Sequence, residues 1–144
     1  HARFHCNDMV VDGNGTAWVG NFGFDLDGEL KSRGGDVFKN HPLANLVRVD
    51  PTGGVHLAAE GMDFPNGSVV TPDGRTLIVG ETLGSRLTAF NISTDNTLSD
   101  RRTWADTEGV LPDGICLNER NQVWVANATA PEVVPSTFGR DIQV

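Results

Sequence analysis

The fold of this chain is decided by residues 65–79, which read PNGSVVTPDGRTLIV. An Asn-Gly pair is followed by a short apolar run, a Pro-Asp-Gly turn and a second apolar run. Turn residues between two short runs rich in β-branched side chains predict an antiparallel pair of strands. The polar residue that leads this pair is Asn66.

The same pattern occurs twice more in the chain. Residues 7–19 read NDMVVDGNGTAWV, and residues 113–125 read DGICLNERNQVWV. Each copy begins with a polar residue, and these are Asn7, Asn66 and Asp113. The three copies are separated by 59 and 47 residues. Such repetition predicts a series of similar supersecondary units rather than a single irregular domain.

Further strand patterns complete the units. We expect strands at residues 4–12, 16–20, 46–50 and 55–59 in the first unit, and at 68–71, 76–79, 86–92 and 102–104 in the second. The third unit gives two strands and becomes ambiguous over 126–144, where prolines interrupt the pattern. No helix of ordinary length is predicted, and residues 21–45 are expected to form one long irregular loop.

Four short antiparallel strands per unit predict an all-β protein of the β-propeller type. We place blade-like units at residues 7–60, 64–106 and 111–144, which makes about two and a half blades and no second domain. Because the chain opens at His1, close to the first repeat and without a signal-peptide pattern, we expect an N-terminal portion to be missing. A cytoplasmic location is expected, with secretion left open.

Composition excludes several classes of function. The net charge is −8, and the basic residues form no cluster beyond Arg101-Arg102. Nucleic-acid binding is therefore not expected. No apolar run approaches the roughly 20 residues of a membrane-spanning helix, so no membrane partner is expected. Cys6 and Cys116 lack the spacing of a zinc pair, and we expect two free, partly buried thiols.

Strand order in a propeller predicts where polar residues gather. The first strand of each blade lines the central channel, so Asn7, Asn66 and Asp113, placed just before these strands, are expected at one mouth of the channel. Their oxygens suit a hard divalent cation, Ca²⁺ first. The connections after the second strands, with Glu81, Thr82 and Asn127, are expected beside them. Pro-Asn-Gly and Pro-Asp-Gly also form turns in their own right, and spacing alone favours that structural explanation.

Together the three units resemble the SMP-30/gluconolactonase family (regucalcin-like), six-bladed propellers of metal-dependent sugar lactonases. The resemblance runs from about residue 4 to residue 127. Its most specific parts are residues 7–12 with 18–20, residues 64–67 with 72–74, and residues 111–114 with 123–126.

The resemblance implies that Asn66 and Asp113 are metal ligands, and that Asp113 also acts as the general base. It implies that Asn7 contacts substrate or a metal-bound water. His5 stands where many members carry Arg, and it is assigned to substrate binding. The implied cofactor is a divalent ion, Ca²⁺ or otherwise Mg²⁺, Mn²⁺ or Zn²⁺. The family's further ligand, a Glu near the start of the first blade, is expected from the missing N-terminus.

The predicted activity is metal-dependent hydrolysis of a sugar or aldonic lactone, a carboxylic ester, with this chain alone inactive. The partner is then a small-molecule lactone. Two alternatives stay open. One is a non-catalytic propeller that binds a protein or carbohydrate, and the other is a different esterase or strictosidine-synthase-like reaction.

Overall fold

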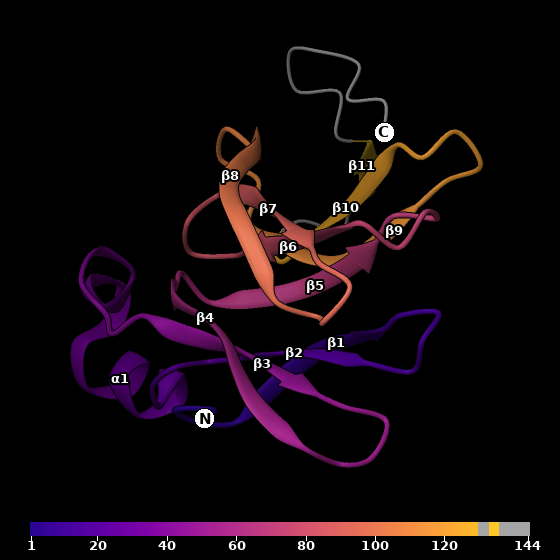
Figure 1. The fold of residues 1–144 in the computed structure, drawn as a ribbon. Coiled ribbons are helices and arrows are strands. Elements are labelled where there is room, and N and C mark those ends of the chain that lie inside the picture. Colours follow the sequence, from indigo (N-terminus) through magenta and orange to yellow (C-terminus); the bar gives the residue numbers. More distant parts are fainter. Residues whose placement is uncertain (130–132, 136–144) are drawn as a thin grey trace.

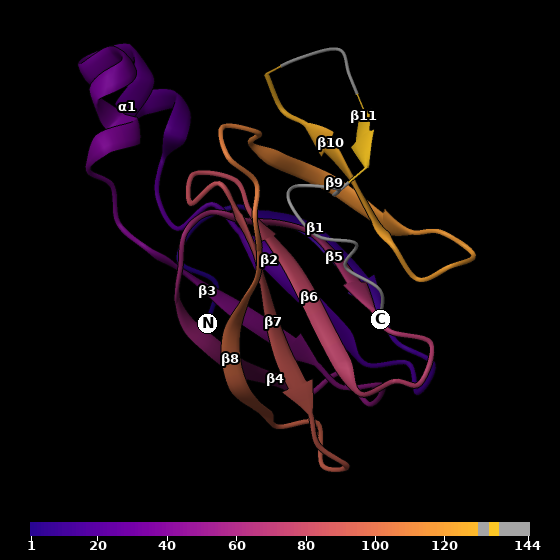
Figure 2. The ribbon, with the colours of Figure 1, turned by 90° about the horizontal axis from the view of Figure 1, so that it is seen from above.

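The computed structural model describes residues 1–129 and 133–135. Its strands form three antiparallel sheets that stand side by side in chain order (Figures 1 and 2). We call them blades 1, 2 and 3. Blade 1 consists of β1 (Cys6–Val11), β2 (Ala17–Asn21), β3 (Ala44–Val49) and β4 (Val55–Met62). Blade 2 consists of β5 (Pro65–Val70), β6 (Thr76–Glu81), β7 (Arg86–Ile92) and β8 (Leu98–Asp106). Blade 3 consists of β9 (Pro112–Leu117), β10 (Val123–Asn127) and β11 (Val133–Pro135).

This arrangement confirms the prediction of an all-β, propeller-type fold. Several strands are longer than their sequence pattern predicts. β5 begins at Pro65 rather than at residue 68, because Pro65 already pairs with Glu81. β8 extends from Leu98 to Asp106 because it pairs with β7 along its length. Residues 130–132 and 136–144 of the third expected unit lie outside the described residues.

The first two strands of each blade are joined by the same tight turn. Its last residue has a positive φ and is Gly15 (+82°), Gly74 (+72°) or Asn121 (+59°). The amide of that residue donates to the carbonyl oxygen three residues earlier, at 3.0, 2.8 and 2.9 Å respectively. Glycine adopts this backbone conformation without strain, and Asn tolerates it better than most other residues. The repeated turn explains why the three hairpins were recognisable in the sequence.

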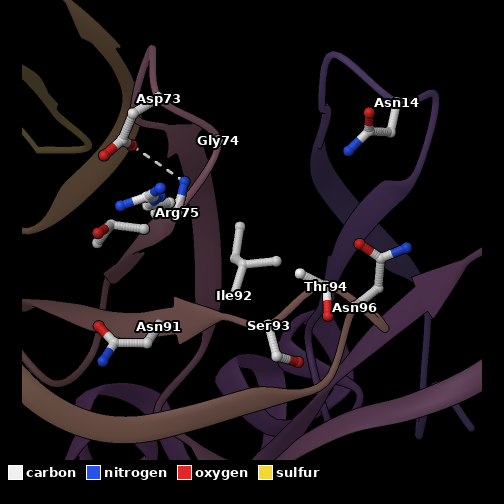
Figure 3. Close-up of a pocket in the computed structure, with 10 residues that line it drawn as sticks. Asn14, Asp73, Gly74, Arg75, Asn91, Ile92, Ser93, Thr94 and Asn96 are labelled. Carbon is white, nitrogen blue, oxygen red and sulfur yellow. Dashed lines mark hydrogen bonds between the residues drawn. The ribbon is translucent and has the colours of Figure 1, made fainter.

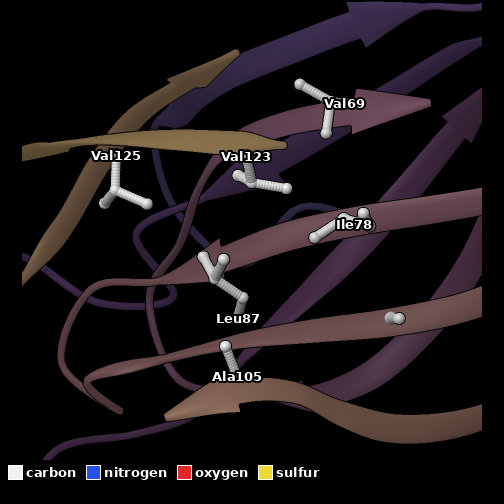
Figure 4. Close-up of a cluster of buried hydrophobic side chains, with 7 residues drawn as sticks. Val69, Ile78, Leu87, Ala105, Val123 and Val125 are labelled. Atoms are coloured by element: carbon white, nitrogen blue, oxygen red, sulfur yellow. The ribbon is translucent and has the colours of Figure 1, made fainter. Parts of the chain in front are cut away.

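Apolar side chains fill the space between neighbouring blades. Blades 1 and 2 enclose a cluster of six buried residues: Trp18, Leu46, Met62, Leu77, Val79 and Phe90. Blades 2 and 3 enclose a second cluster, of which Figure 4 labels Val69, Ile78, Leu87, Ala105, Val123 and Val125. Each sheet therefore buries a face against the next, as expected for packed β layers.

The opposite face of blade 1 is apolar, and in the described part of the chain its side chains are buried on the two central strands and exposed on the two edge strands. Cross-strand pairing places Met9, Val19, Val47 and Leu57 in one row across the four strands. Met9 is 58% exposed and Leu57 is 43% exposed. We call this surface the outer face of blade 1.

Residues 21–45 differ from the predicted irregular loop. They contain α1 (Leu26–Arg33) and the 3-10 helix η1 (Gly34–Lys39). Asp25 caps α1 through its Oδ1, which accepts the Gly28 amide at 3.0 Å. Glu29 and Arg33 form an ion pair one turn apart, at 2.8 Å. The prediction of an irregular loop was wrong here because α1 is short and has only two apolar residues. These are Leu26 and Leu30, which are partly buried against a cluster of Phe24, Val37 and Phe64.

Candidate functional site

The three residues that lead the repeats occupy the same place in three blades. Asn7, Asn66 and Asp113 are each the second residue of the first strand of their blade. Pairing of the preceding residue includes each of them in its strand, and in blade 2 this extends the strand expected at residues 68–71 back past Asn66. β1 contacts β5, and β5 contacts β9. The three positions therefore lie along adjoining strands on the same side of the blade series.

A β-bulge marks this position in every blade. The pairing register shifts between Cys6 and Met9 in β1, and between Pro65 and Ser68 in β5. In blade 3 the shift falls between Val125 and Asn127 of β10, opposite the start of β9. A bulge turns a side chain away from the regular alternation of the strand. The repeated bulge thus gives all three polar residues the same backbone setting.

Asn66 and Asp113 lie within hydrogen-bond distance although 47 residues separate them. Asn66 Nδ2 donates to Asp113 Oδ1 at 2.9 Å. Asn66 is 6% exposed, whereas Asp113 is open to solvent. The same Nδ2 also donates to Thr82 Oγ1 at 3.1 Å. An accessible carboxylate is therefore held beside a buried amide at the junction of blades 2 and 3.

The close approach of β5 and β9 depends on Gly67. A Cβ at this position would lie 2.4 Å from the Asp113 carbonyl oxygen and 2.5 Å from the Ile115 nitrogen. Only glycine allows the two backbones to come this close. Gly67 directly follows Asn66, so it brings the two polar side chains together.

Asn7 and His5 lie near this junction but make other contacts. Asn7 Nδ2 donates to the Pro65 carbonyl oxygen at 3.4 Å. The exposed His5 ring stacks on Phe4, with the ring centroids 4.2 Å apart. Within residues 1–129, no hydrogen bond joins either residue to Asn66 or Asp113. The structure therefore brings two of the four sequence-predicted residues into direct contact.

Glu81, expected beside the site, is committed to a buried ion pair. Its carboxylate accepts from Arg86 Nε at 3.0 Å and Arg86 Nη2 at 2.8 Å, from the Asp63 amide, and from the Thr88 hydroxyl. Burial alone would raise the pKa of Glu81, but the hydrogen bonds from Arg86, Thr88 and the Asp63 amide together hold it below its usual value. Burial raises the pKa of Asp63, and His41, whose Nε2 lies 3.3 Å from Asp63 Oδ1, partly offsets this. This network fixes the segment that leads into Asn66.

Asn127 occupies in blade 3 the place that Glu81 has in blade 2. Each pairs with the proline that precedes the polar residue of the first strand. Asn127 Oδ1 accepts the backbone amides of Leu111 and Thr129, each at 3.2 Å. The Asn127 side chain therefore stabilises the segment that leads into β9.

The Asn66–Asp113 pair meets part of the requirement of a divalent cation site. A hard cation such as Ca²⁺ binds six to eight oxygen atoms, as a rule from carboxylates, amides and water. The pair offers one carboxylate and one amide oxygen. The described residues hold no group of three or more His, Cys, Asp and Glu side chains placed to bind a metal. The two residues therefore fit a shared cation site and need further ligands to complete it.

A polar groove lies at the other ends of the strands. It measures about 720 Å³ and is lined by turns of blades 1 and 2, with Asn14, Arg75, Asn91 and Asn96 among its residues (Figure 3). Asp73 accepts the Arg75 amide at 3.0 Å within its own turn. Since this groove contains neither Asn66 nor Asp113, its size does not identify it with the candidate site.

The two thiols take no part in the pair. Cys6 and Cys116 are both free, as predicted, but both are exposed, so the expected partial burial was wrong. None of the helices in the described part of the chain has the length and apolar character needed to cross a membrane.

Three antiparallel sheets, whose adjoining first strands each carry a polar residue at a bulge, define this chain as part of a β-propeller. A family model then identifies the family. The model described as SMP-30/Gluconolactonase/LRE-like region matches residues 1–137, and the chain belongs to this family.

Several solved structures are similar to the chain. A gluconolactonase from Xanthomonas campestris is 30% identical, with a TM-score of 0.69 over 96% of this chain and 44% of its own. A luciferin-regenerating enzyme (17% identity, TM-score 0.73) and a calcium-binding regucalcin from Agrobacterium tumefaciens (19% identity, TM-score 0.67) share the fold. They match 91% and 85% of this chain, and 41% and 38% of their own.

A plant protein is also related. Protein STRICTOSIDINE SYNTHASE-LIKE 13 of Arabidopsis thaliana is 35% identical over 91 residues, which is 62% of this chain and 22% of the plant protein. The chain thus spans less than half the length of each of these relatives.

Proposed function

We propose that the chain forms part of the active site of a metal-dependent hydrolase that opens a sugar or aldonic lactone. The observation that carries this proposal is the 2.9 Å contact between Asn66 and Asp113 across a blade junction. Membership of the SMP-30/gluconolactonase family and the 30% identity to a gluconolactonase support it.

Asp113 is the general base in this proposal. Its carboxylate is exposed, so a water molecule and a lactone can reach it. The hydrogen bond from Asn66 fixes one carboxylate oxygen and leaves the other to accept a proton from the attacking water. Asn66, almost fully buried, has its own position fixed by Thr82.

Asn66 Oδ1 and the Asp113 carboxylate are the groups of this chain that would hold a divalent ion, with Ca²⁺ as the first choice. A bound ion would supply Lewis-acid stabilisation of the negative charge that develops on the lactone carbonyl oxygen. A Glu supplied by sequence before residue 1 is proposed as a further ligand. Asn7 and His5 lie on the side of blade 1 and are proposed to contact the substrate.

The test uses the full-length protein, a panel of sugar and aldonic lactones, and EDTA. Asn66→Ala and Asp113→Ala should each abolish lactone opening, and EDTA should do the same to the unmodified protein. Asn14→Ala and Asp73→Ala are matched controls, since they remove the same side-chain types at the other ends of the strands. These controls should keep activity. Full activity in EDTA, or in both site variants, would eliminate the proposal.

The similarity to a strictosidine synthase-like protein favours a second candidate, a different reaction at the same propeller mouth. Turnover of simple esters or of amine and aldehyde pairs, with no opening of any lactone, would support that candidate. A non-catalytic propeller would show neither activity, and its binding of a protein or carbohydrate would be insensitive to EDTA.

A further inference from the structure

The residue after the second strand has the same backbone role in all three blades. Phe22, Thr82 and Ala128 follow the ends of β2, β6 and β10. Each donates its backbone amide to the carbonyl oxygen two residues before the polar residue of the first strand. The acceptors are His5, Phe64 and Leu111, at 3.0, 3.1 and 2.9 Å. Since blades 1 and 3 carry Phe and Ala here, this backbone role does not require a hydroxyl group.

The hydroxyl of Thr82 makes two further hydrogen bonds. It donates to the Pro112 carbonyl oxygen at 2.5 Å, and its oxygen accepts from Asn66 Nδ2 at 3.1 Å. Thr82 is 6% exposed, so both bonds are shielded from water. One side chain of blade 2 is thereby joined to Asn66 and to the residue before Asp113.

The hydrogens available to Thr82, Asp113 and Asn66 determine the orientation of the Asn66 amide. A hydroxyl has one hydrogen, and that of Thr82 is used on Pro112, so its oxygen can only accept from Asn66. The ionised Asp113 carboxylate can also only accept. Both neighbours therefore require the NH₂ group, which has two hydrogens to give. A flipped amide would place Asn66 Oδ1 against two oxygen acceptors.

We infer that Thr82 is a positioning residue that holds the Asn66 amide so that its carbonyl oxygen is the atom available to a cation or a substrate hydroxyl. This inference rests on the proposed function, in which Asn66 Oδ1 is a ligand. Asn66 Oδ1 accepts no hydrogen bond from the residues that the structure describes. The Thr82 hydroxyl thus holds the NH₂ group of Asn66 in hydrogen bonds and thereby leaves Asn66 Oδ1 available.

The experiment compares variants of the full-length protein by calorimetric titration with CaCl₂ and by NMR of the Asn66 side-chain amide without metal. Thr82→Val keeps the shape of the side chain and removes the hydroxyl, while Thr82→Ser restores it. Thr82→Ala is the second variant, because blade 3 carries Ala128 at the same place. Thr107→Val is the matched control. Thr107 is buried like Thr82, and its hydroxyl also donates to a backbone carbonyl, that of Val110 at 2.7 Å.

We expect Thr82→Val and Thr82→Ala to bind Ca²⁺ about 5-fold more weakly, the equivalent of one lost neutral hydrogen bond. Rotation that exchanges the two Asn66 amide hydrogens should become faster in the same two variants. Thr82→Ser and Thr107→Val should match the unmodified protein in both measurements. Unchanged amide rotation in Thr82→Val and Thr82→Ala, or an equal loss of Ca²⁺ affinity in Thr107→Val, would overturn the inference.

The two proposals fail separately. If the unmodified protein binds neither Ca²⁺ nor Mg²⁺, Mn²⁺ or Zn²⁺, the proposed metal-dependent function fails. The amide rotation rates, measured without metal, still decide whether Thr82 positions Asn66.

Discussion

Replacing Gly67 with Ala should separate Asn66 from Asp113 without touching either side chain. The new Cβ would lie 2.4 Å from the Asp113 carbonyl oxygen and 2.5 Å from the Ile115 nitrogen. Both are backbone atoms, so no side-chain rotation relieves the clash. Contact becomes ordinary at about 3.4 Å, so β5 and β9 would have to move apart by roughly 1 Å. The Asn66–Asp113 bond, now 2.9 Å, would then exceed hydrogen-bond length.

The expected cost of this overpacking is about 1–3 kcal/mol of unfolding free energy. The assays use the full-length protein at a temperature where the variant stays folded, so that unfolding does not account for lost function. Under these conditions lactone opening and Ca²⁺ binding should still fall strongly. Urea unfolding and calorimetric titration measure the two effects.

Gly114→Ala is the control for Gly67→Ala. Gly114 follows Asp113 as Gly67 follows Asn66, but a Cβ at Gly114 would meet no atom within 4 Å. This variant should keep both stability and Ca²⁺ affinity. If Gly67→Ala behaves like Gly114→Ala, the close approach of β5 and β9 does not hold the pair together.

Three further variants test other parts of the fold. Glu81→Gln should lose about 3 kcal/mol of unfolding free energy at pH 7, because the buried ion pair with Arg86 is broken. Since the folded pKa of Glu81 is lowered, this difference in urea unfolding should be full above the usual value of 4.5 and vanish as pH falls through the folded pKa. Asp25→Ala should cost about 1 kcal/mol through loss of the α1 cap, and a normal thermal midpoint would contradict that assignment. Val55→Lys with Leu57→Lys should reduce self-association in light scattering, because these side chains are 49% and 43% exposed on the outer face of blade 1.

The sequence predicted those parts of the fold that depend on local chemistry. The hairpin that opens each blade is specified by a turn residue with positive φ and by short runs of apolar residues, and both are visible in the sequence. α1 was missed because much of its local stabilisation comes from the Asp25 cap and the Glu29–Arg33 ion pair. Its two apolar residues, Leu26 and Leu30, are too few to reveal a helical period in the sequence. Charged residues in a segment that contains glycines are as typical of a loop as of a short helix.

The candidate site was predictable only in part. Asn66 and Asp113 hold the same position in two repeats, which predicted that they lie near each other, and the structure places them in contact. The role of Gly67 was not predictable, because glycine after Asn is also an ordinary turn residue. The ion pair and hydrogen bonds of the Glu81 side chain were not predictable either, since its partners on β7 come close only after blade 2 has formed.

The repeat and its exceptions have different functions in this molecule. The repeat gives Asn7, Asn66 and Asp113 the same backbone setting, a bulge at the start of a first strand. Within the described residues, the junction of blades 2 and 3 differs from blade 1 at two positions close to these polar residues. Gly67 has Asp8 as its counterpart in blade 1, and Thr82 has Phe22. A shared position gives each first strand a polar side chain, but Gly67 and the Thr82 hydroxyl, both without an equivalent in blade 1, turn two such side chains into a hydrogen-bonded pair. For this reason the Gly67 and Thr82 variants test the site more sharply than changes at the repeated positions do.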